Sequence, residues 1–178
     1  MPASPARSAI IEEQLPPVCR GEFIDGMSRV AAAVSIVTTD GAAGRDGMAV
    51  TAMSAVSADA EFPTLLICVK STSRPAPLIR ANGVFCVNVL AENQVAFSDL
   101  FSGRNGGDRD SWFTHGRWSR LYTSAPALDS ALVNFDCTVA EVSDVGTHHV
   151  IIGSVLAVRI APGRPLLYAN RGYGRLSE

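Results

Sequence analysis

Several features that mark common functional classes are absent from this chain of 178 residues. No apolar stretch approaches the roughly 20 residues of a membrane-spanning helix, because the longest largely uncharged stretch, 121–133, is interrupted by Pro126 and Asp129. Lysine and arginine are scattered singly and the formal net charge is -2, so there is no basic patch for a nucleic acid. No Ser-His-Asp set, carboxylate pair or cluster of metal ligands stands out. We expect no membrane, nucleic-acid or metal partner.

The cysteines and the N-terminal segment indicate a reducing compartment. Paired spacing is missing among the four cysteines, Cys19, Cys68, Cys86 and Cys137. Three of them lie in apolar, strand-like runs, where cysteine behaves as a small hydrophobe, so we expect reduced thiols. The opening segment MPASPARSAI has neither the apolar core nor the cleavage site of a secretion signal. We expect a flexible N-terminal tail over residues 1–21, one domain over 22–178 and a cytoplasmic location.

The hydrophobic pattern predicts a mainly β fold. Apolar residues make up 47% of the chain, enough for one sizeable core. The first of three short helices is expected to pack the N-terminal end onto the body, and the glycine-rich residues 41–47 are expected to form a hairpin loop. Strands are expected over residues 34–39, 48–56, 64–70, 83–90, 132–145, 150–160 and, as a last edge, 165–176; helices are expected over 22–33, 75–81 and 93–101. Strands with such short connections indicate a closed or nearly closed barrel.

The segment 47–70 is unusual because its first strand carries small and hydroxyl residues. Thr51, Ala52 and Ser54 stand where a core strand would carry valine, isoleucine or phenylalanine. One interpretation is close packing against a helix. The other is that a flat ligand lies against this strand, which large side chains would block. The following strand, 64–70, is expected to be buried on both faces.

A polar cluster follows that strand and precedes a helix that begins with proline. Its members are Lys70, Ser71, Thr72, Ser73 and Arg74. Hydroxyls, free N–H groups and two cations at a helix start suit a phosphate group. The alternative is an ordinary helix N-cap with two solvated charges.

Residues 102–111 have the composition of a mobile loop. Three aromatic residues behind it, Trp112, Phe113 and Trp118, have few apolar neighbours in the sequence. They could close over a site or an interface, or they could anchor the loop to the core. The sequence leaves both interpretations open.

Taken together, the motifs resemble the short-chain NAD(P)H:flavin oxidoreductases, which are the reductase components of two-component monooxygenases and have an FMN-binding split barrel. The resemblance covers residues 27–176 and rests on MSRVAAAVSIVTT, GMAVTAMSAVS, PTLLICVKSTS, FCVNVLA with DLFSGR, GTHHVIIGSV and PLLYANRGYGRL. It implies a flavin reductase that passes a hydride from NADH or NADPH to FMN or FAD. It also implies a separate oxygenase that receives the reduced flavin.

The resemblance assigns the cofactor-binding residues to two segments. The isoalloxazine is expected to lie against Thr51, Ala52, Met53 and Ser54. The ribityl phosphate is expected near Lys70, Thr72 and Ser73. Both assignments agree with the interpretation of these segments from their residue types.

The family's GDH motif corresponds to Gly146, Thr147 and His148, and the histidine is expected near the incoming nicotinamide. Threonine stands where the family has aspartate, and a hydroxyl cannot supply a negative charge to support the histidine. A neutral, positioning role is therefore expected for His148. Two further departures near the flavin edge are the longer loop with Glu61 and Phe62 and the PAP that follows the phosphate segment.

Three alternatives define what the sequence leaves open. An enzyme similar to pyridoxamine phosphate oxidases on a related barrel should carry more arginine and lysine. A non-catalytic flavin- or haem-binding module would, for haem, depend on His115, His148 or His149 as axial ligand. A single barrel leaves one side of the flavin open, and the apolar strands over 131–142, which have few edge charges, would leave an exposed patch on a monomer. Both features predict a homodimer.

Overall fold

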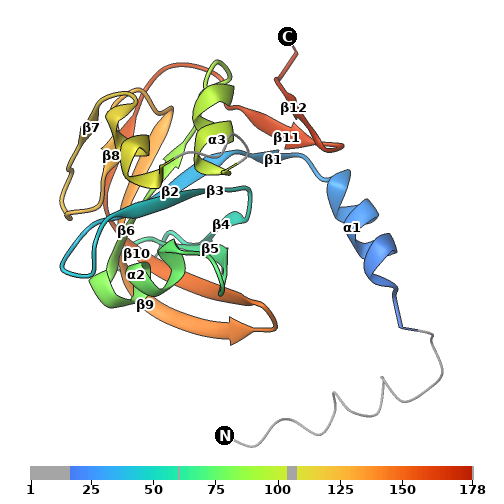
Figure 1. Ribbon diagram of the computed structural model, residues 1–178, viewed down its shortest axis with the longest axis horizontal. Coiled ribbons are helices and arrows are strands. Elements are labelled where there is room, and N and C mark those ends of the chain that lie inside the picture. The colour runs from blue at the N-terminus through green and yellow to red at the C-terminus, as the bar shows by residue number, and fades with distance from the viewer. Residues whose placement is uncertain (1–16, 60, 104–107, 178) are drawn as a thin grey trace, which may run out of the picture.

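A seven-stranded antiparallel sheet dominates the fold (Figure 1). The computed structural model describes residues 17–59, 61–103 and 108–177. Within the sheet the strand order is β3-β2-β6-β9-β10-β5-β4. The strands are β2 (Ser35–Thr39), β3 (Asp46–Val50), β4 (Met53–Ser57), β5 (Thr64–Lys70), β6 (Val84–Val89), β9 (Val133–Val145) and β10 (His148–Ile160). The mainly β prediction and the hairpin between β2 and β3 are confirmed.

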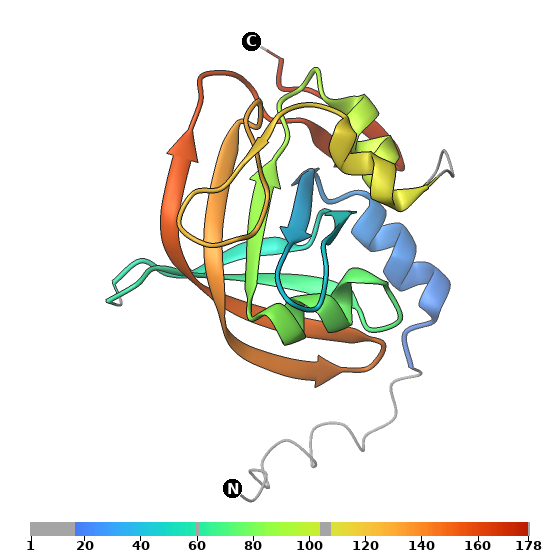
Figure 2. The same ribbon diagram turned by 60° about the vertical axis from the view of Figure 1, so that its left-hand side comes forward.

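The two edge strands of this sheet, β3 and β4, are neighbours in the chain. Only Thr51 and Ala52 separate them, so the sheet must curl until its edges approach each other (Figures 1 and 2). Among the described strands β3 and β4 are not paired with each other, so the barrel is split along this seam. The single strand predicted over 48–56 is therefore wrong. The run TAMSAVS contains no glycine, proline or asparagine to mark the break.

Smaller elements cover the curled sheet. Helices α2 (Pro75–Asn82) and α3 (Val95–Phe101) were both predicted, and both contact β2 and β3. The remaining elements are the 3-10 helix η2 (Arg109–Thr114) and the strands β1 (Ala32–Ala33), β7 (Trp118–Ser119), β8 (Ala127–Leu128), β11 (Leu167–Ala169) and β12 (Gly172–Gly174). Strand β11 pairs with both β1 and β12, and β7 pairs with β8. No helix in the described part of the chain is long and apolar enough to cross a membrane.

Two large apolar clusters form most of the core, beside a small one around Cys86. One fills the barrel and includes Ile67, Phe85 and Ile151; the other lies under α3 and includes Ile36 and Trp112. Strand β2 contributes to both clusters and is buried along its whole length. Strand β5 is different, because only alternate residues, starting at Leu65, are fully buried. The prediction that both faces of β5 are buried is wrong, and its second face is partly open.

Strand β9 does not form the exposed patch predicted from residues 131–142. It lies inside the sheet between β6 and β10. Its apolar residues Phe135, Val139 and Val142 pack against the barrel core. The small number of charges in this stretch therefore reflects burial within the sheet.

Helix α1 (Arg20–Ser28) lies outside the barrel in both views (Figures 1 and 2). It contains no buried residue, and Phe23 and Met27 are 63% and 53% exposed. The helix is tied to the β11–β12 turn where the Arg171 guanidinium lies 2.5 Å from the Asp25 carboxylate. The prediction that this helix packs onto the body is wrong, as is its extent to residue 33. The helix begins at Arg20, within the predicted tail, and residues 1–16 of that tail lie outside the described residues.

The aromatic residues after the predicted loop anchor it to the core. Trp112 is buried and its ring centroid lies 5.2 Å from that of Phe101. Phe113 and Trp118 also surround Phe101, with ring centroids 5.5 and 5.6 Å away. These contacts support the interpretation that the aromatic residues anchor the segment to the core. Residues 104–107 of the loop lie outside the described residues.

The four cysteines are free, and they differ in their environments. Burial, together with the neighbouring Asp136 carboxylate, raises the pKa of the Cys137 thiol to about 12. Burial likewise raises the pKa of Cys86 well above its usual range. Both thiols therefore stay protonated at neutral pH, where a thiolate would be the reactive form.

This difference predicts how the thiols react. In the native protein a disulfide reagent such as DTNB should modify Cys19, which is exposed, quickly and Cys68, which is partly buried, more slowly. Cys86 and Cys137 should react only after unfolding in guanidinium chloride. A Cys19→Ser variant should lose only the fast phase. Rapid reaction of all four thiols in the native protein would contradict the assignment.

Candidate functional site

The outer face of β4, β5 and β10 brings the predicted site residues together. In the antiparallel register Ser54 lies opposite Leu66, and His148 lies opposite Lys70. Residues paired in this way point to the same side of a sheet, and successive residues alternate. Ala52, Ser54, Cys68, Lys70 and His148 therefore share one face, which we call the site face. The starts of β4 and β10 and the end of β5 meet at the same end of the sheet.

The residues at and just after the junction of β3 and β4 have small side chains, so this part of the site face is flat. Thr51, Ala52 and Ser54 are exposed, and the Cys68 N–H donates to the Ala52 carbonyl at 3.1 Å. Because their side chains are exposed, close packing against a helix does not explain their small size. Met53 is the exception, since its side chain packs against the barrel core and points away from the site face. Of the four residues predicted for the ring, Met53 can contact a ligand there only through its backbone.

The segment that follows β5 is a well-bonded turn. The N–H and the hydroxyl of Ser71 both donate to the Thr147 carbonyl, each at 3.0 Å. The Ser73 hydroxyl donates to the Lys70 carbonyl at 2.6 Å. Lys70 and Thr72 are exposed, and Lys70 is the only lysine in the sequence. The turn thus presents an ammonium group and a hydroxyl beside His148.

The start of α2 is not capped by a side chain. Arg74 occupies the N-cap position but makes no side-chain capping bond, and Pro75 follows it. Among the described residues no acceptor is hydrogen-bonded to the backbone N–H of Thr72. The ordinary N-cap interpretation therefore does not account for the hydroxyls of this segment. Pro75 and Pro77 have no N–H and the Ala76 N–H donates to the Ser73 carbonyl, which leaves the Thr72 N–H, just before the helix, as an open backbone donor. Together with the Lys70 ammonium group and the Thr72 hydroxyl it favours an anion.

The two histidines of the turn between β9 and β10 have different neighbours. Gly146 adopts a left-handed conformation, with φ of 57°, and Thr147 completes the turn before β10 begins at His148. The Thr147 Oγ1 and His148 Nδ1 atoms are 3.0 Å apart, and both residues are exposed. His149 points to the opposite side and forms a hydrogen bond with the Asp144 carboxylate. The nearby acid therefore supports His149, and His148 has only the hydroxyl that the sequence predicted.

Sequence reasoning missed part of the site. Cys68 and Leu66 belong to the site face, and the alternation of burial in β5 was the signal that could have shown this. A recess of about 150 Å³ beside Thr51 is lined by Tyr168 and Tyr173, whose ring centroids are 5.4 Å apart. These tyrosines come from β11 and β12, about 120 residues away in the chain, and only the fold brings them to the seam. In residues 17–59, 61–103 and 108–177, no three His, Cys, Asp or Glu side chains are grouped to hold a metal.

Comparisons with known proteins agree with this geometry. Residues 27–177 match the family model described as flavin reductase like domain. The chain is 43% identical over 153 residues to FMN reductase (NADH) RutF of Agrobacterium fabrum, covering 85% of this chain and 86% of the relative. A crystal structure described as a flavin reductase of Haemophilus somnus matches with a TM-score of 0.84 and 34% identity, covering 89% of this chain and all of that one.

A second solved structure extends the comparison. It is BorF, the flavin reductase component of a bacterial two-component tryptophan halogenase. It matches with a TM-score of 0.81 and 25% identity, covering 90% of this chain and 99% of that one. The family model spans the curled sheet, the seam, the phosphate segment and the histidine turn, so the chain belongs to the family of flavin reductase like domains.

Proposed function

We propose that this protein is an NADH:flavin oxidoreductase that reduces FMN. The observation that carries the proposal is that Ala52, Ser54, Lys70 and His148 lie on one open face at one end of the sheet. A bound flavin supplies the redox chemistry by accepting a hydride at its N5 atom. The chain needs no general acid or base for such a transfer, which suits a site without paired carboxylates. FMN and NADH are the pair named for the RutF relative.

Each part of the site face has a task that fits its chemistry. Ala52 and Ser54 leave room for a flat ring over the sheet, and the backbone of the seam offers hydrogen-bonding groups. Lys70 and Thr72 would hold the phosphate through an ammonium group, a hydroxyl and the Thr72 N–H. Ser73, whose hydroxyl and N–H both donate to the Lys70 carbonyl, would hold the turn around the phosphate in shape. His148 would position the nicotinamide. The family match favours this reductase over an enzyme similar to pyridoxamine phosphate oxidases or a haem-binding module.

Steady-state NADH oxidation with FMN, FAD or no flavin tests the activity directly. Oxidation that depends on added flavin supports the proposal, and none with either flavin would refute it. The single lysine allows a second test that does not depend on turnover. FMN should protect Lys70 from acetylation, whereas riboflavin, which lacks the phosphate, should protect it much less. Equal protection by the two ligands would remove Lys70 from the phosphate site.

His148 is predicted to act in binding. Because its neighbour is the Thr147 hydroxyl at 3.0 Å, a charged role in the transfer step is not supported by a carboxylate. His148→Ala should raise the KM for NADH more than it lowers kcat. His115→Ala is the matched control, since His115 is exposed and lies just after η2. Unchanged kinetics in His148→Ala would remove this residue from the site.

We further propose that the reduced flavin leaves and serves a separate oxygenase, as the reductase component named for the halogenase system suggests. The site face is open, so flavin affinity in the micromolar range is expected, about -8 kcal/mol. Such binding permits exchange within a second or less. The test places protein, NADH and flavin on one side of an anaerobic dialysis membrane and cytochrome c on the other. Cytochrome c that is never reduced would show that the flavin stays bound.

A homodimer is also proposed, on the basis of helix α1. Phe23, Met27 and Val30 are all more than half exposed on and just after this helix, whose contacts with the β11–β12 turn are polar and leave these side chains uncovered. A second copy would cover these side chains. Light scattering at micromolar concentration should give twice the mass of one chain, and Phe23→Ser with Met27→Ser should shift the equilibrium toward the monomer. A wild-type monomer would refute the proposal. The cytoplasmic location stays a prediction.

A further inference from the structure

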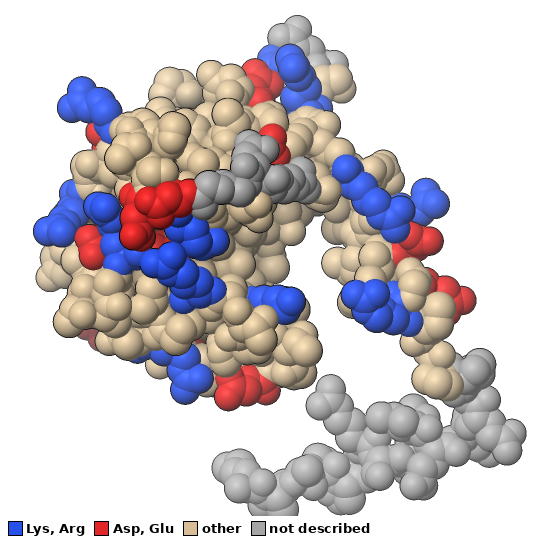
Figure 3. Space-filling view, viewed as in Figure 1, with Lys and Arg blue, Asp and Glu red and all other residues tan. Residues whose placement is uncertain are grey.

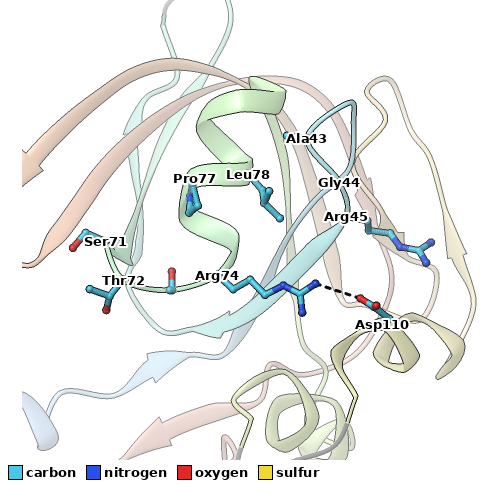
Figure 4. A pocket seen from close by; sticks show the side chains of 10 residues that line it. Ala43, Gly44, Arg45, Ser71, Thr72, Arg74, Pro77, Leu78 and Asp110 are labelled. Carbon is cyan, nitrogen blue, oxygen red and sulfur yellow. Dashed lines mark hydrogen bonds and ion pairs between the residues drawn. The ribbon is translucent and has the colours of Figure 1, made fainter.

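A pocket of about 660 Å³ adjoins the phosphate segment on the side of α2 (Figure 4). Three parts of the chain line it. They are the β2–β3 hairpin loop with Arg45, the start of α2 with Thr72 and Arg74, and η2 with Asp110. The pocket is thus continuous with the phosphate segment at one end and reaches the hairpin loop at the other. Its volume is in the range of small-molecule sites and exceeds what one phosphate group fills.

Positive charge exceeds negative charge around this pocket. Asp46, only 2% exposed, lies 2.9 Å from the Arg109 guanidinium and 3.3 Å from that of Arg74. Arg74 also reaches Asp110 at 3.4 Å. Asp46 therefore contacts both arginines, and Arg74 contacts both carboxylates. Arg45 adds a third cation. On the left of the face in Figure 3, basic side chains gather around a few acidic ones, over the region of α2 and the hairpin loop.

Arg45 and Arg74 are held in place but keep donors for a ligand. The Arg45 guanidinium lies over the Phe113 ring, 4.7 Å from its centroid, and the residue is exposed. Arg74 is 55% exposed, and its contacts with the two aspartates use Nε and Nη2. Figure 4 shows the Arg74 side chain crossing the pocket toward Asp110. A fixed guanidinium with open N–H groups is well suited to a phosphate oxygen.

We propose that this pocket binds the second phosphate of a dinucleotide, with Arg45 and Arg74 as its ligands. The inference rests on the proposed function, which places the first phosphate at Lys70, Thr72 and Ser73. A mononucleotide such as FMN would leave the Arg45 end empty. A pyrophosphate, whether of FAD or of the nicotinamide dinucleotide, would reach both ends. Arg45 and Arg74 are therefore residues that discriminate dinucleotides from FMN.

Asp110 opposes this binding. Its carboxylate is exposed, lines the same pocket and occupies one donor of Arg74. A phosphate entering the pocket must compete with it and meets its negative charge. Removing that charge should strengthen dinucleotide binding, which is the opposite of the effect expected at Arg45. If the changes at Arg45 and Asp110 alter dinucleotide affinity in opposite directions, a general loss of structure does not explain them.

Calorimetric titrations with FMN, with FAD and with NADH in the absence of flavin test the inference. Arg45→Ala should raise the Kd of FAD, of NADH or of both by about tenfold, and the Kd of FMN should stay within about twofold. Asp110→Asn should lower the affected dinucleotide Kd by about threefold. Arg117→Ala, at an exposed arginine paired with Asp129 outside the pocket, should change none of the three. Which dinucleotide responds identifies the source of the pyrophosphate.

Three results would overturn the inference. They are unchanged affinities in Arg45→Ala, equal losses for FMN and the dinucleotides, and no saturable dinucleotide binding to the wild-type chain. Failure of the proposed function looks different, since the wild-type chain would then oxidise no NADH with any flavin. A working FMN reductase whose Arg45→Ala variant keeps its dinucleotide affinity refutes this inference alone.

Discussion

Replacing Ala52 with leucine is expected to raise the dissociation constant for FMN by about tenfold or more, at least about 1.4 kcal/mol. Ala52 is exposed at the seam and takes part in the sheet through its carbonyl, which accepts a hydrogen bond from Cys68 N–H at 3.1 Å. A leucine side chain would rise above a face that is flat because Ala52 and Ser54 are small. A ring lying on this face would lose contact along much of its surface. Titration of FMN fluorescence or heat measures the effect.

The fold should survive this change, because the new side chain points away from the core. Ala140→Leu is the matched control, since Ala140 is an exposed alanine on β9 of the same sheet. Both variants should melt close to the wild type, and only Ala52→Leu should lose FMN affinity. Unchanged affinity in a folded Ala52→Leu protein would refute the placement of the ring at the seam.

Most strands could be predicted from the sequence because their apolar runs end at turn residues. The break between β3 and β4 could not, since Thr51 and Ala52 are not turn residues such as glycine, proline or asparagine, and only the curling of the sheet makes them a corner. The outward position of α1 was missed for a related reason. Its apolar spacing shows that some surface should cover Phe23 and Met27, but spacing cannot say whether that surface belongs to the same chain.

The candidate site divides in the same way. Segments whose residue types carry the chemistry, such as Lys70 to Ser73 and the turn at His148, could be found from the sequence. Their proximity comes from the pairing of β5 with β10, which sets His148 opposite Lys70. The inward orientation of Met53 and the pairing of Asp144 with His149 depend on register. A shift by one residue would reverse both, and residue type alone does not fix it.

Replacing Asp136 with alanine is expected to lower the free energy of unfolding by about 3 kcal/mol or more. Asp136 is fully buried on β9, and its carboxylate accepts three hydrogen bonds. The donors are the N–H groups of Tyr122 and Thr123, at 2.8 and 2.6 Å, and the Thr123 hydroxyl at 2.6 Å. Alanine would leave these three partly buried donors without their acceptor, and each buried unsatisfied group costs about 1–3 kcal/mol.

The loss of stability should be greatest in the segment between β7 and β8, because Asp136 bonds that segment to strand β9 of the barrel. Urea unfolding should show the lower midpoint, and the melting temperature should fall by roughly 6–12 °C, since about 1 kcal/mol corresponds to about 2–4 °C in a domain of this size. Asp136→Asn should lose less than alanine, because its amide oxygen still accepts while its amide nitrogen faces a donor. Asp59→Ala, at an exposed loop position, should change stability by no more than about 0.5 kcal/mol. An Asp136→Ala protein as stable as this control would show that the buried carboxylate does not hold the segment between β7 and β8 in place.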